Sequence, residues 1–109
     1  MTSVKFYLDH RDKSPVGDFL DKNKEVKVKA SMIIKNITEF GLVSVMSHVK
    51  KLSGYPLWEI RILGKESTRI LYASKIKDEI ILLHTFKKKT KKTPVKEIKI
   101  AMTRYNQLS

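Results

Sequence analysis

The sequence predicts an α+β domain in which a small antiparallel sheet packs against an N-terminal helical hairpin and a C-terminal helix. Near both ends of the chain, apolar residues recur every three or four positions, which is the helical period. Through residues 57–86 they alternate with polar residues, which is the strand period. Helices and strands that occupy separate stretches of the chain are typical of the α+β class.

The N-terminal part predicts one strand and two helices. Apolar and polar residues alternate over 4–8, as expected for a half-buried strand. Asp12 or Ser14 can cap a first helix, whose first turn accommodates Pro15. A second apolar face of helical period runs over about residues 23–40. So short a link between the two helices predicts that they pack together as a hairpin.

The C-terminal half predicts three strands, over 57–63, 67–74 and 79–86, joined by tight turns as an antiparallel meander. Residues 42–56 show no clear pattern, although Val45, Val49 and Leu52 have the spacing of a short helical turn and residues 53–56 have the composition of a loop. One sheet face should bury a set of apolar residues: Trp58, Ile60, Ile62, Ile70 and Tyr72. The opposite face should present Glu59, Arg61 and Arg69. Thr93 is a suitable N-cap, and Pro94 a suitable first residue, for the final helix.

Length and composition indicate a single domain spanning residues 1–109. The chain has 41% hydrophobic residues, enough to form a core without covalent cross-links. It contains no cysteine, which excludes disulfides and thiolate chemistry and fits a cytoplasmic location. No apolar stretch is long enough for a signal peptide or a membrane span, so we expect no membrane association.

The charge of the chain predicts an anionic partner. Twenty-three Lys and Arg against eleven Asp and Glu give a formal net charge of +12. Five lysines crowd into residues 87–92, called here the lysine-rich loop, and no acidic residue separates them. Their mutual repulsion costs folding free energy, which a bound polyanion would offset. An anionic membrane surface, an acidic protein and simple solvation of charged faces are the other interpretations of this charge.

Several other chemistries lack the residues that they need. The three histidines do not have the spacing of a zinc site, and the four isolated glycines form no phosphate-binding loop. The basic final helix has the charge of a membrane-surface helix, but its apolar positions are needed for the core. We therefore expect no metal and no small-molecule cofactor.

Motifs in the C-terminal half resemble a known superfamily. They are the Trp-Glu-Ile-Arg strand at 58–61, the Arg-Ile-Leu-Tyr strand at 69–72, and a junction with the residues His84, Phe86, Lys88, Lys89, Thr90, Lys92, Thr93 and Pro94. Spacing, residue type and element order together resemble the RelE/ParE superfamily of type II toxin–antitoxin toxins, and most closely its phage-derived HigB-like branch.

The resemblance implies a toxin that cleaves translated mRNA on the ribosome without a metal, and that a cognate antitoxin protein keeps silent. In such cleavage the RNA 2′-hydroxyl attacks the neighbouring phosphate. Two alternatives remain open: a non-nuclease of the ParE type that acts on DNA gyrase, and a nucleic-acid-binding module without catalysis. Fold alone does not separate these functions, because function depends on the site.

The candidate site residues are basic. For catalysis we expect Arg61 and Arg69, whose guanidinium groups grip phosphate oxygens, together with Lys88 and His84 as groups that transfer protons. For RNA binding we expect the remaining lysines of the lysine-rich loop: Lys87, Lys89, Lys91 and Lys92.

Competing interpretations exist for several of these residues. Arg61 can instead pair with Glu59 or Glu66 on the strand face. His84 is equally well explained as a buried structural histidine, and His48 as an exposed loop histidine. Tyr72 and Tyr105 are better explained as core residues than as catalytic ones. The general base remains open.

Overall fold

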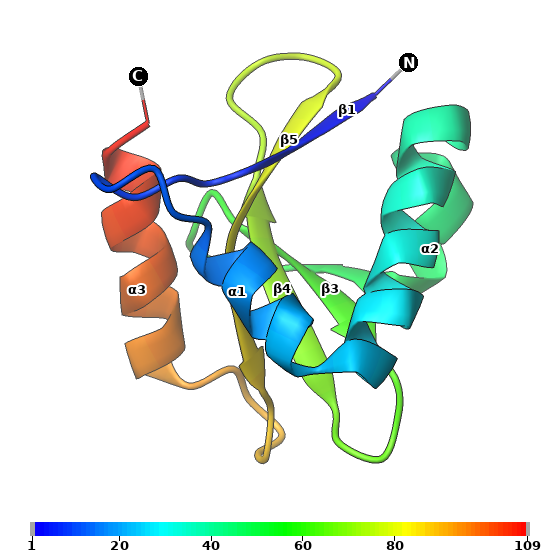
Figure 1. The fold of residues 1–109 in the computed structure, drawn as a ribbon. Coiled ribbons are helices and arrows are strands. Elements are labelled where there is room, and N and C mark those ends of the chain that lie inside the picture. Colours follow the sequence, from blue (N-terminus) through cyan, green and yellow to red (C-terminus); the bar gives the residue numbers. More distant parts are fainter. Residues whose placement is uncertain (1, 109) are drawn as a thin grey trace.

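The computed structural model describes residues 2–108 and contains a five-stranded sheet with helices on both faces (Figure 1). In chain order the elements are β1 (Ser3–Phe6), α1 (Pro15–Lys22), α2 (Lys24–Phe40), the 3-10 helix η1 (Leu42–His48), β2 (Val49–Lys51), β3 (Trp58–Ile62), β4 (Thr68–Ala73), β5 (Glu79–Lys87) and α3 (Val95–Asn106). The predicted α+β class is confirmed. Within residues 2–108, no helix combines the length and apolarity needed to cross a membrane.

The strand order is β1-β5-β4-β3-β2. The meander β3-β4-β5 is antiparallel, as predicted. The sheet as a whole is mixed, however, because β1 pairs with β5 in parallel, with Val4 opposite Ile80. A parallel pair needs a long crossover, and the helices together with the meander supply it here. Strand β2 lies at the other edge, in the segment where the sequence showed no clear pattern.

Helices α1 and α2 cover one face of the sheet, and Asn23 alone separates them. The predicted helical hairpin thus contributes to a single core. Ser14 caps α1 by accepting a hydrogen bond from the Gly17 N–H at 2.9 Å, and Pro15 occupies the first turn as predicted. Gly41 ends α2 with φ of 82°, a conformation that disfavours any side chain.

The apolar face predicted for the sheet packs against these two helices. Ile60, Ile62, Ile70 and Tyr72 are buried there, whereas Trp58 is half-buried. Its ring stacks on Tyr72 with 5.7 Å between the centroids. Burial raises the pKa of Tyr72 to about 12, which fits a core residue rather than a proton-transfer group.

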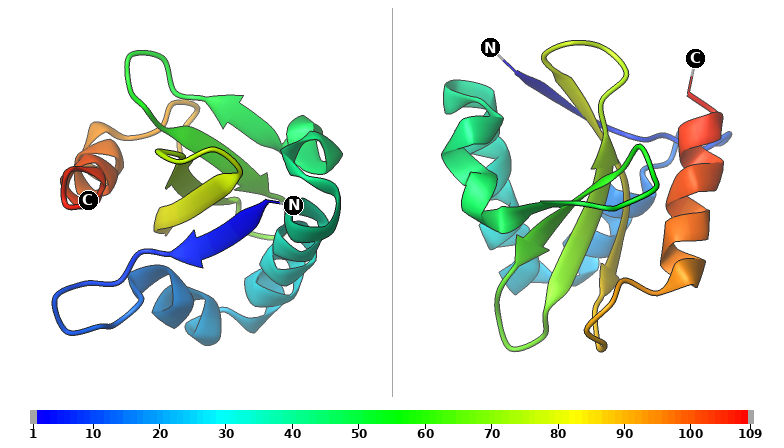
Figure 2. Two further views of the ribbon diagram at one scale, coloured as in Figure 1. Left: turned by 90° about the horizontal axis from the view of Figure 1, so that it is seen from above. Right: turned by 180° about the vertical axis from the view of Figure 1, so that it is seen from behind.

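Helix α3 packs against the opposite face, so the sheet lies between two helical layers (Figure 2). This second core is formed by Leu52, Leu57, Leu71, Ala73, Leu83, Phe86, Ile98 and Ala101. The face that carries Glu59, Arg61 and Arg69 is therefore partly covered, rather than open over its whole length. Tyr105 packs at the edge of this core, as predicted.

A β-bulge in β5 determines which side chains face α3. Leu71 lies opposite His84, but the next residue, Tyr72, lies opposite Leu82, so Leu83 is an extra residue. The bulge reverses the alternation beyond it. His84 and Phe86 consequently turn toward α3, and their rings stack with centroids 5.6 Å apart.

Candidate nucleic-acid interface

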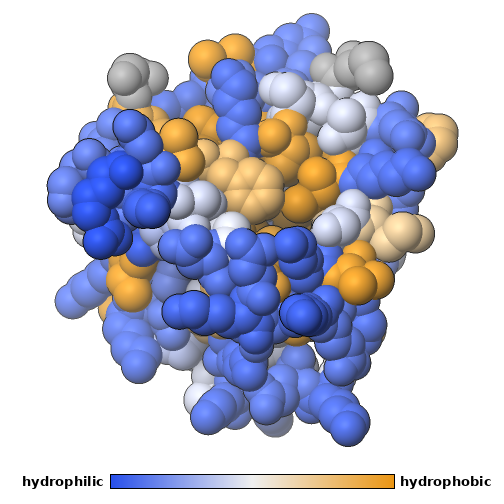
Figure 3. All heavy atoms as spheres, in the orientation of Figure 1, coloured by the Kyte–Doolittle hydropathy of each residue, from blue (hydrophilic) through white to orange (hydrophobic). Residues whose placement is uncertain are grey.

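A cleft of about 340 Å³ opens on the α3 side of the sheet, between the β2–β3 edge and the loop that precedes α3. We call it the basic cleft. Its lining residues are Ser47, His48, Val49, Lys50, Glu59, Arg61, Arg69, Lys88 and Lys91. Five of these side chains are Lys or Arg and only one is acidic, so the lining is strongly cationic. Figure 3 shows that hydrophilic side chains also dominate the end of the molecule that holds the β3–β4 turn and the lysine-rich loop.

Strand register brings the two arginines together. Arg61 on β3 lies directly opposite Arg69 on β4, so both side chains project from the same face. Lys50 on β2 lies opposite Glu59 on β3 and shares that face. Directly opposed residues have Cβ atoms about 5 Å apart, which is close enough for two guanidinium groups to hold one phosphate.

Glu59 is the buried centre of the cleft floor. Its side chain is only 3% exposed, and Oε1 lies 3.0 Å from Arg69 Nε and 3.8 Å from Lys88 Nζ. The Arg69 contact is an ion pair rather than an aligned hydrogen bond, because Oε1 has no hydrogen-bond donor. The other oxygen, Oε2, accepts a hydrogen bond from the Thr93 hydroxyl at 3.0 Å. One carboxylate thus holds β4 and the loop before α3 against β3.

The Thr93 contact corrects the prediction for the start of the last helix. Thr93 does not cap α3. Pro94 occupies the N-cap position without a side-chain hydrogen bond, and the helix begins at Val95. Rather than accepting a backbone N–H at the start of the helix, the Thr93 hydroxyl donates a hydrogen bond to the ionisable carboxyl group of Glu59.

Arg61 is an exposed cation on β3 at the cleft floor. Its Nη2 donates a hydrogen bond to the Ser47 carbonyl oxygen at 3.3 Å, which draws η1 toward β3. Within residues 2–108, no carboxylate lies within ion-pair distance of its guanidinium. The alternative pairing with Glu59 or Glu66 is therefore wrong, because these carboxylates contact Arg69 and Lys87 respectively.

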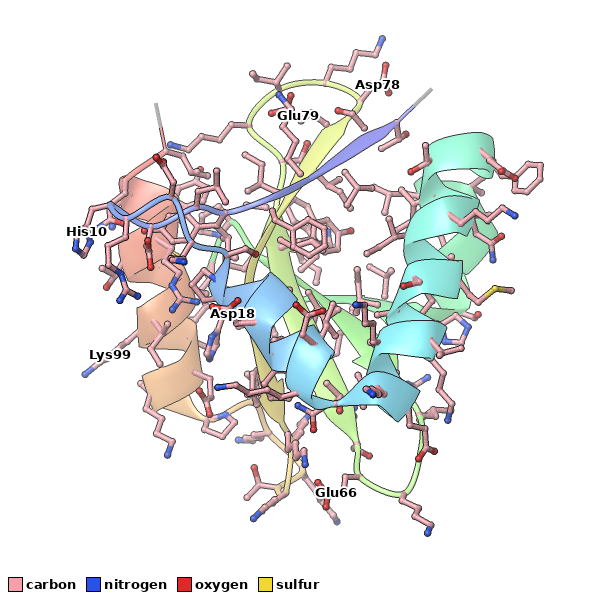
Figure 4. All side chains as sticks on the ribbon, in the orientation of Figure 1. His10, Asp18, Glu66, Asp78, Glu79 and Lys99 are labelled. Carbon is pink, nitrogen blue, oxygen red and sulfur yellow. The ribbon has the colours of Figure 1, made fainter. Side chains whose placement is uncertain are left out.

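The lysine-rich loop divides between the cleft and the rest of the surface. Lys88 is 7% exposed and faces Glu59, while Lys91 is exposed and lines the cleft. Lys87 points elsewhere and pairs with Glu66 at 2.6 Å. This pair lowers the pKa of Glu66, which Figure 4 labels at the β3–β4 turn. Lys89 and Lys92 are exposed and outside the lining of the cleft.

His84 lies outside the basic cleft, beneath α3. Its Nε2 lies 2.8 Å from Glu97 Oε1, and its Nδ1 lies 3.3 Å from Arg104 Nη1. Burial, the largest influence, lowers the pKa of His84 below its ordinary 6.5, and Arg104 adds to this, although Glu97 opposes it. The hydrogen-bond network fits a neutral ring whose Nε2–H donates to Glu97 and whose Nδ1 accepts from Arg104. Both ring nitrogens are therefore engaged by α3.

The structure adds His48 and Lys50 to the residues expected from the sequence. They come from the end of η1 and from β2, in the segment that showed no clear pattern. Little in the sequence indicated their position. They flank Val49, which packs toward the core under α1 and α2, and Val49 begins a strand of three residues. Three residues are too few to establish an alternation.

A family model described as phage derived protein Gp49-like (DUF891) matches residues 18–106. The chain belongs to this family. The Gp49-like family lies in the RelE/toxin-like group, which agrees with the superfamily resemblance of the motifs. No curated protein matches the chain.

Proposed function

We propose that this Gp49-like protein is the toxin of a type II toxin–antitoxin system, with the HigB-like activity of a metal-independent endoribonuclease on ribosome-bound mRNA. The observation that carries the proposal is the convergence of Arg61, Arg69, Lys88 and Lys91 on one cleft. Scattered surface charges would give only general attraction to RNA. Cations that converge on one concave site can hold a single phosphate group.

The chemistry of RNA self-cleavage suits such a site. The nucleophile is the 2′-hydroxyl of the substrate itself, so the protein needs no metal to generate one. The transition state places additional negative charge on the phosphate oxygens, and guanidinium groups stabilise that charge. Arg61 is available to bind it, because among residues 2–108 the Ser47 carbonyl oxygen is the one hydrogen-bond partner of its guanidinium. Arg69 keeps its Nε toward Glu59 and donates from Nη1 to the Thr68 carbonyl oxygen at 3.2 Å, which fixes its orientation.

Neutralisation by an antitoxin is the second part of the proposal. A chain with a net charge of +12 and a cationic cleft is complementary to an acidic polypeptide segment. A segment that covers the cleft, or that holds α3 away from its working position, would exclude RNA. The same charge favours association with ribosomes and mRNA.

The test is charge reversal at Arg61. The expected result for Arg61→Glu is loss of growth inhibition on expression in a bacterial host, and at least a 100-fold slower cleavage of mRNA on ribosomes, measured by mapping cut ends. Lys99→Glu is the matched control, because Lys99 is an exposed cation on α3 that points away from the sheet (Figure 4). Arg69 is less suitable for reversal, since a second carboxylate beside buried Glu59 would unfold the protein.

The outcomes separate the candidate functions. Cut mRNA with wild-type protein and with Lys99→Glu, but not with Arg61→Glu, supports the proposal. Growth inhibition without cut ends, accompanied by inhibited DNA supercoiling, would instead indicate a gyrase-directed toxin. Salt-sensitive RNA binding with neither toxicity nor cleavage would indicate a passive binding module.

A further inference from the structure

We propose that His48 is the proton acceptor for the 2′-hydroxyl in this reaction, an assignment that rests on the function proposed above. The cleft residues described so far are mostly suited to binding negative charge. A reaction that begins with the loss of a hydroxyl proton also needs an acceptor. Histidine is the side-chain type that exchanges protons most readily near neutral pH.

Strand register places His48 beside the arginine pair. Val49 lies opposite Ile60 in the antiparallel β2–β3 pair, and Lys50 lies opposite Glu59. His48, the last residue of η1, directly precedes β2, and extending the register by this one residue would bring His48 next to Arg61. Arg61 in turn lies opposite Arg69, so His48, at the end of η1, and the two arginines on β3 and β4 form one row along the cleft.

The side-chain directions agree with this row. Val49 packs toward the first core, so its neighbours His48 and Lys50 point to the other face of the sheet. His48 and Lys50 both line the basic cleft, and His48 is half-buried there. The hydrogen bond from Arg61 Nη2 to the carbonyl oxygen of Ser47 holds the adjacent residue against β3.

The spacing suits an acceptor beside a phosphate clamp. Arg61 and Arg69 are directly paired and have Cβ atoms about 5 Å apart, so a phosphate held between them lies in the cleft that His48 also lines, and the preceding ribose would face His48. The 2′-oxygen forms its bond to phosphorus as its proton passes to the neutral imidazole. The bond from phosphorus to the 5′-oxygen breaks, and that oxygen takes a proton from water or from a cleft ammonium group. The products are a 2′,3′-cyclic phosphate and a 5′-hydroxyl.

The other two histidines are less suited to this role. Both ring nitrogens of His84 are engaged by α3, and His84 does not line the cleft. His10 is exposed on the loop between β1 and α1, and Figure 4 labels it at the edge of the molecule near the end of α3. His48 is the only histidine among the lining residues of the cleft.

The experiment compares His48→Gln with wild-type protein and with His10→Gln as matched control, using ribosomes programmed with a short mRNA. The expected result for His48→Gln is a 100- to 10,000-fold lower cleavage rate, with RNA affinity within about threefold of wild type. The pH profile of the cleavage rate should change in this variant, whereas His10→Gln should keep the wild-type profile. The charged groups that line the cleft with His48 are Lys50, Glu59, Arg61, Arg69, Lys88 and Lys91.

Chemical rescue distinguishes proton transfer from a structural role. His48→Ala should regain part of its activity when free imidazole is added, and the regained rate should follow the concentration of neutral imidazole. Cleavage by His48→Gln at the wild-type rate and with the wild-type pH profile would overturn the assignment of His48 but not the proposed function. The same conclusion would follow if His48→Ala cleaved slowly and added imidazole did not raise its rate. Absence of cleavage by wild-type protein would overturn the proposed function, and this assignment with it.

Discussion

Substitution of Glu59 by Gln tests whether one buried carboxylate holds the basic cleft together. Gln has nearly the same shape and retains an acceptor for the Thr93 hydroxyl. It removes the negative charge that faces Arg69 and Lys88, whose side chains are 12% and 7% exposed. We therefore expect a stable cleft to become a cluster of buried cations without a counter-ion.

The expected cost follows from that burial. Removal of one partner from a buried ion pair destabilises a protein by about 3–5 kcal/mol, because the remaining charge is uncompensated. The lower end of this range applies to Glu59→Gln, since Arg69 borders an open cleft and can gain some hydration. A loss of about 3 kcal/mol is a large fraction of the 5–15 kcal/mol typical of a domain. For a chain of 109 residues it corresponds to a fall in Tm of roughly 12 °C.

Urea unfolding, followed by the fluorescence of Trp58 and by circular dichroism, measures the effect. Glu66→Gln is the matched control, because Glu66 also pairs with a lysine but its side chain is 61% exposed. We expect that control to lose less than about 1 kcal/mol, as is usual for a surface ion pair. The double variant Glu59→Gln with Arg69→Gln should recover part of the loss, since it removes both members of the pair.

Equal losses in Glu59→Gln and Glu66→Gln would refute this reasoning. In that case the Glu59 carboxylate would contribute no more than a surface charge, and the orientation of Arg69 would need another explanation. A normal free energy of unfolding together with lost mRNA cleavage would point instead to a direct chemical role for Glu59.

Two further predictions concern the contacts of α3 and of the loop before it. The folded protein holds the pKa of His84 below its ordinary value, so below about pH 6.5 the unfolded chain binds a proton that the folded protein does not. The Tm of the wild-type protein should therefore fall between pH 7.5 and 5, and the Tm of His84→Gln should fall less over the same range. An identical pH dependence of Tm in the two proteins would contradict the buried neutral ring. Thr93→Val leaves Glu59 Oε2 without its donor and should lower the free energy of unfolding in urea by about 1–3 kcal/mol. In the control Thr103→Val, the lost hydroxyl donates to the Lys99 carbonyl oxygen within α3, and the free energy of unfolding should fall by less than about 0.5 kcal/mol. Equal costs for the two threonine variants would show that the Thr93 contact contributes no stability.

The predicted elements with strong periodicity were confirmed, because a long amphipathic pattern allows only one way to bury its apolar face. Helix α2 and strands β3, β4 and β5 are of this kind. Strand β2 was missed, since three residues carry no measurable period. The parallel pairing of β1 also lies beyond local patterns, because it depends on a partner more than seventy residues away.

For the candidate site, the sequence determined the residue types and the strand face of the arginines. Alternation alone places Arg61 and Arg69 on one side of neighbouring strands, and the lysine-rich loop follows directly in the chain. It could not determine which carboxylate meets which cation. Glu59 contacts Arg69 rather than Arg61 because packing of the loop before α3 buries that end of the cleft.

The sequence by itself thus determined the α+β class and the excess of positive charge, which depend on composition and on short-range periodicity, and its motifs indicated the RelE/toxin-like group. Only the tertiary structure decided which cations share the cleft, because that depends on strand register and on the bulge at Leu83. The bulge turns His84 under α3, and the strand register brings Arg61 beside Arg69 in the cleft that His48 also lines. Such long-range pairings depend on packing across the whole sheet, which no local stretch of sequence encodes.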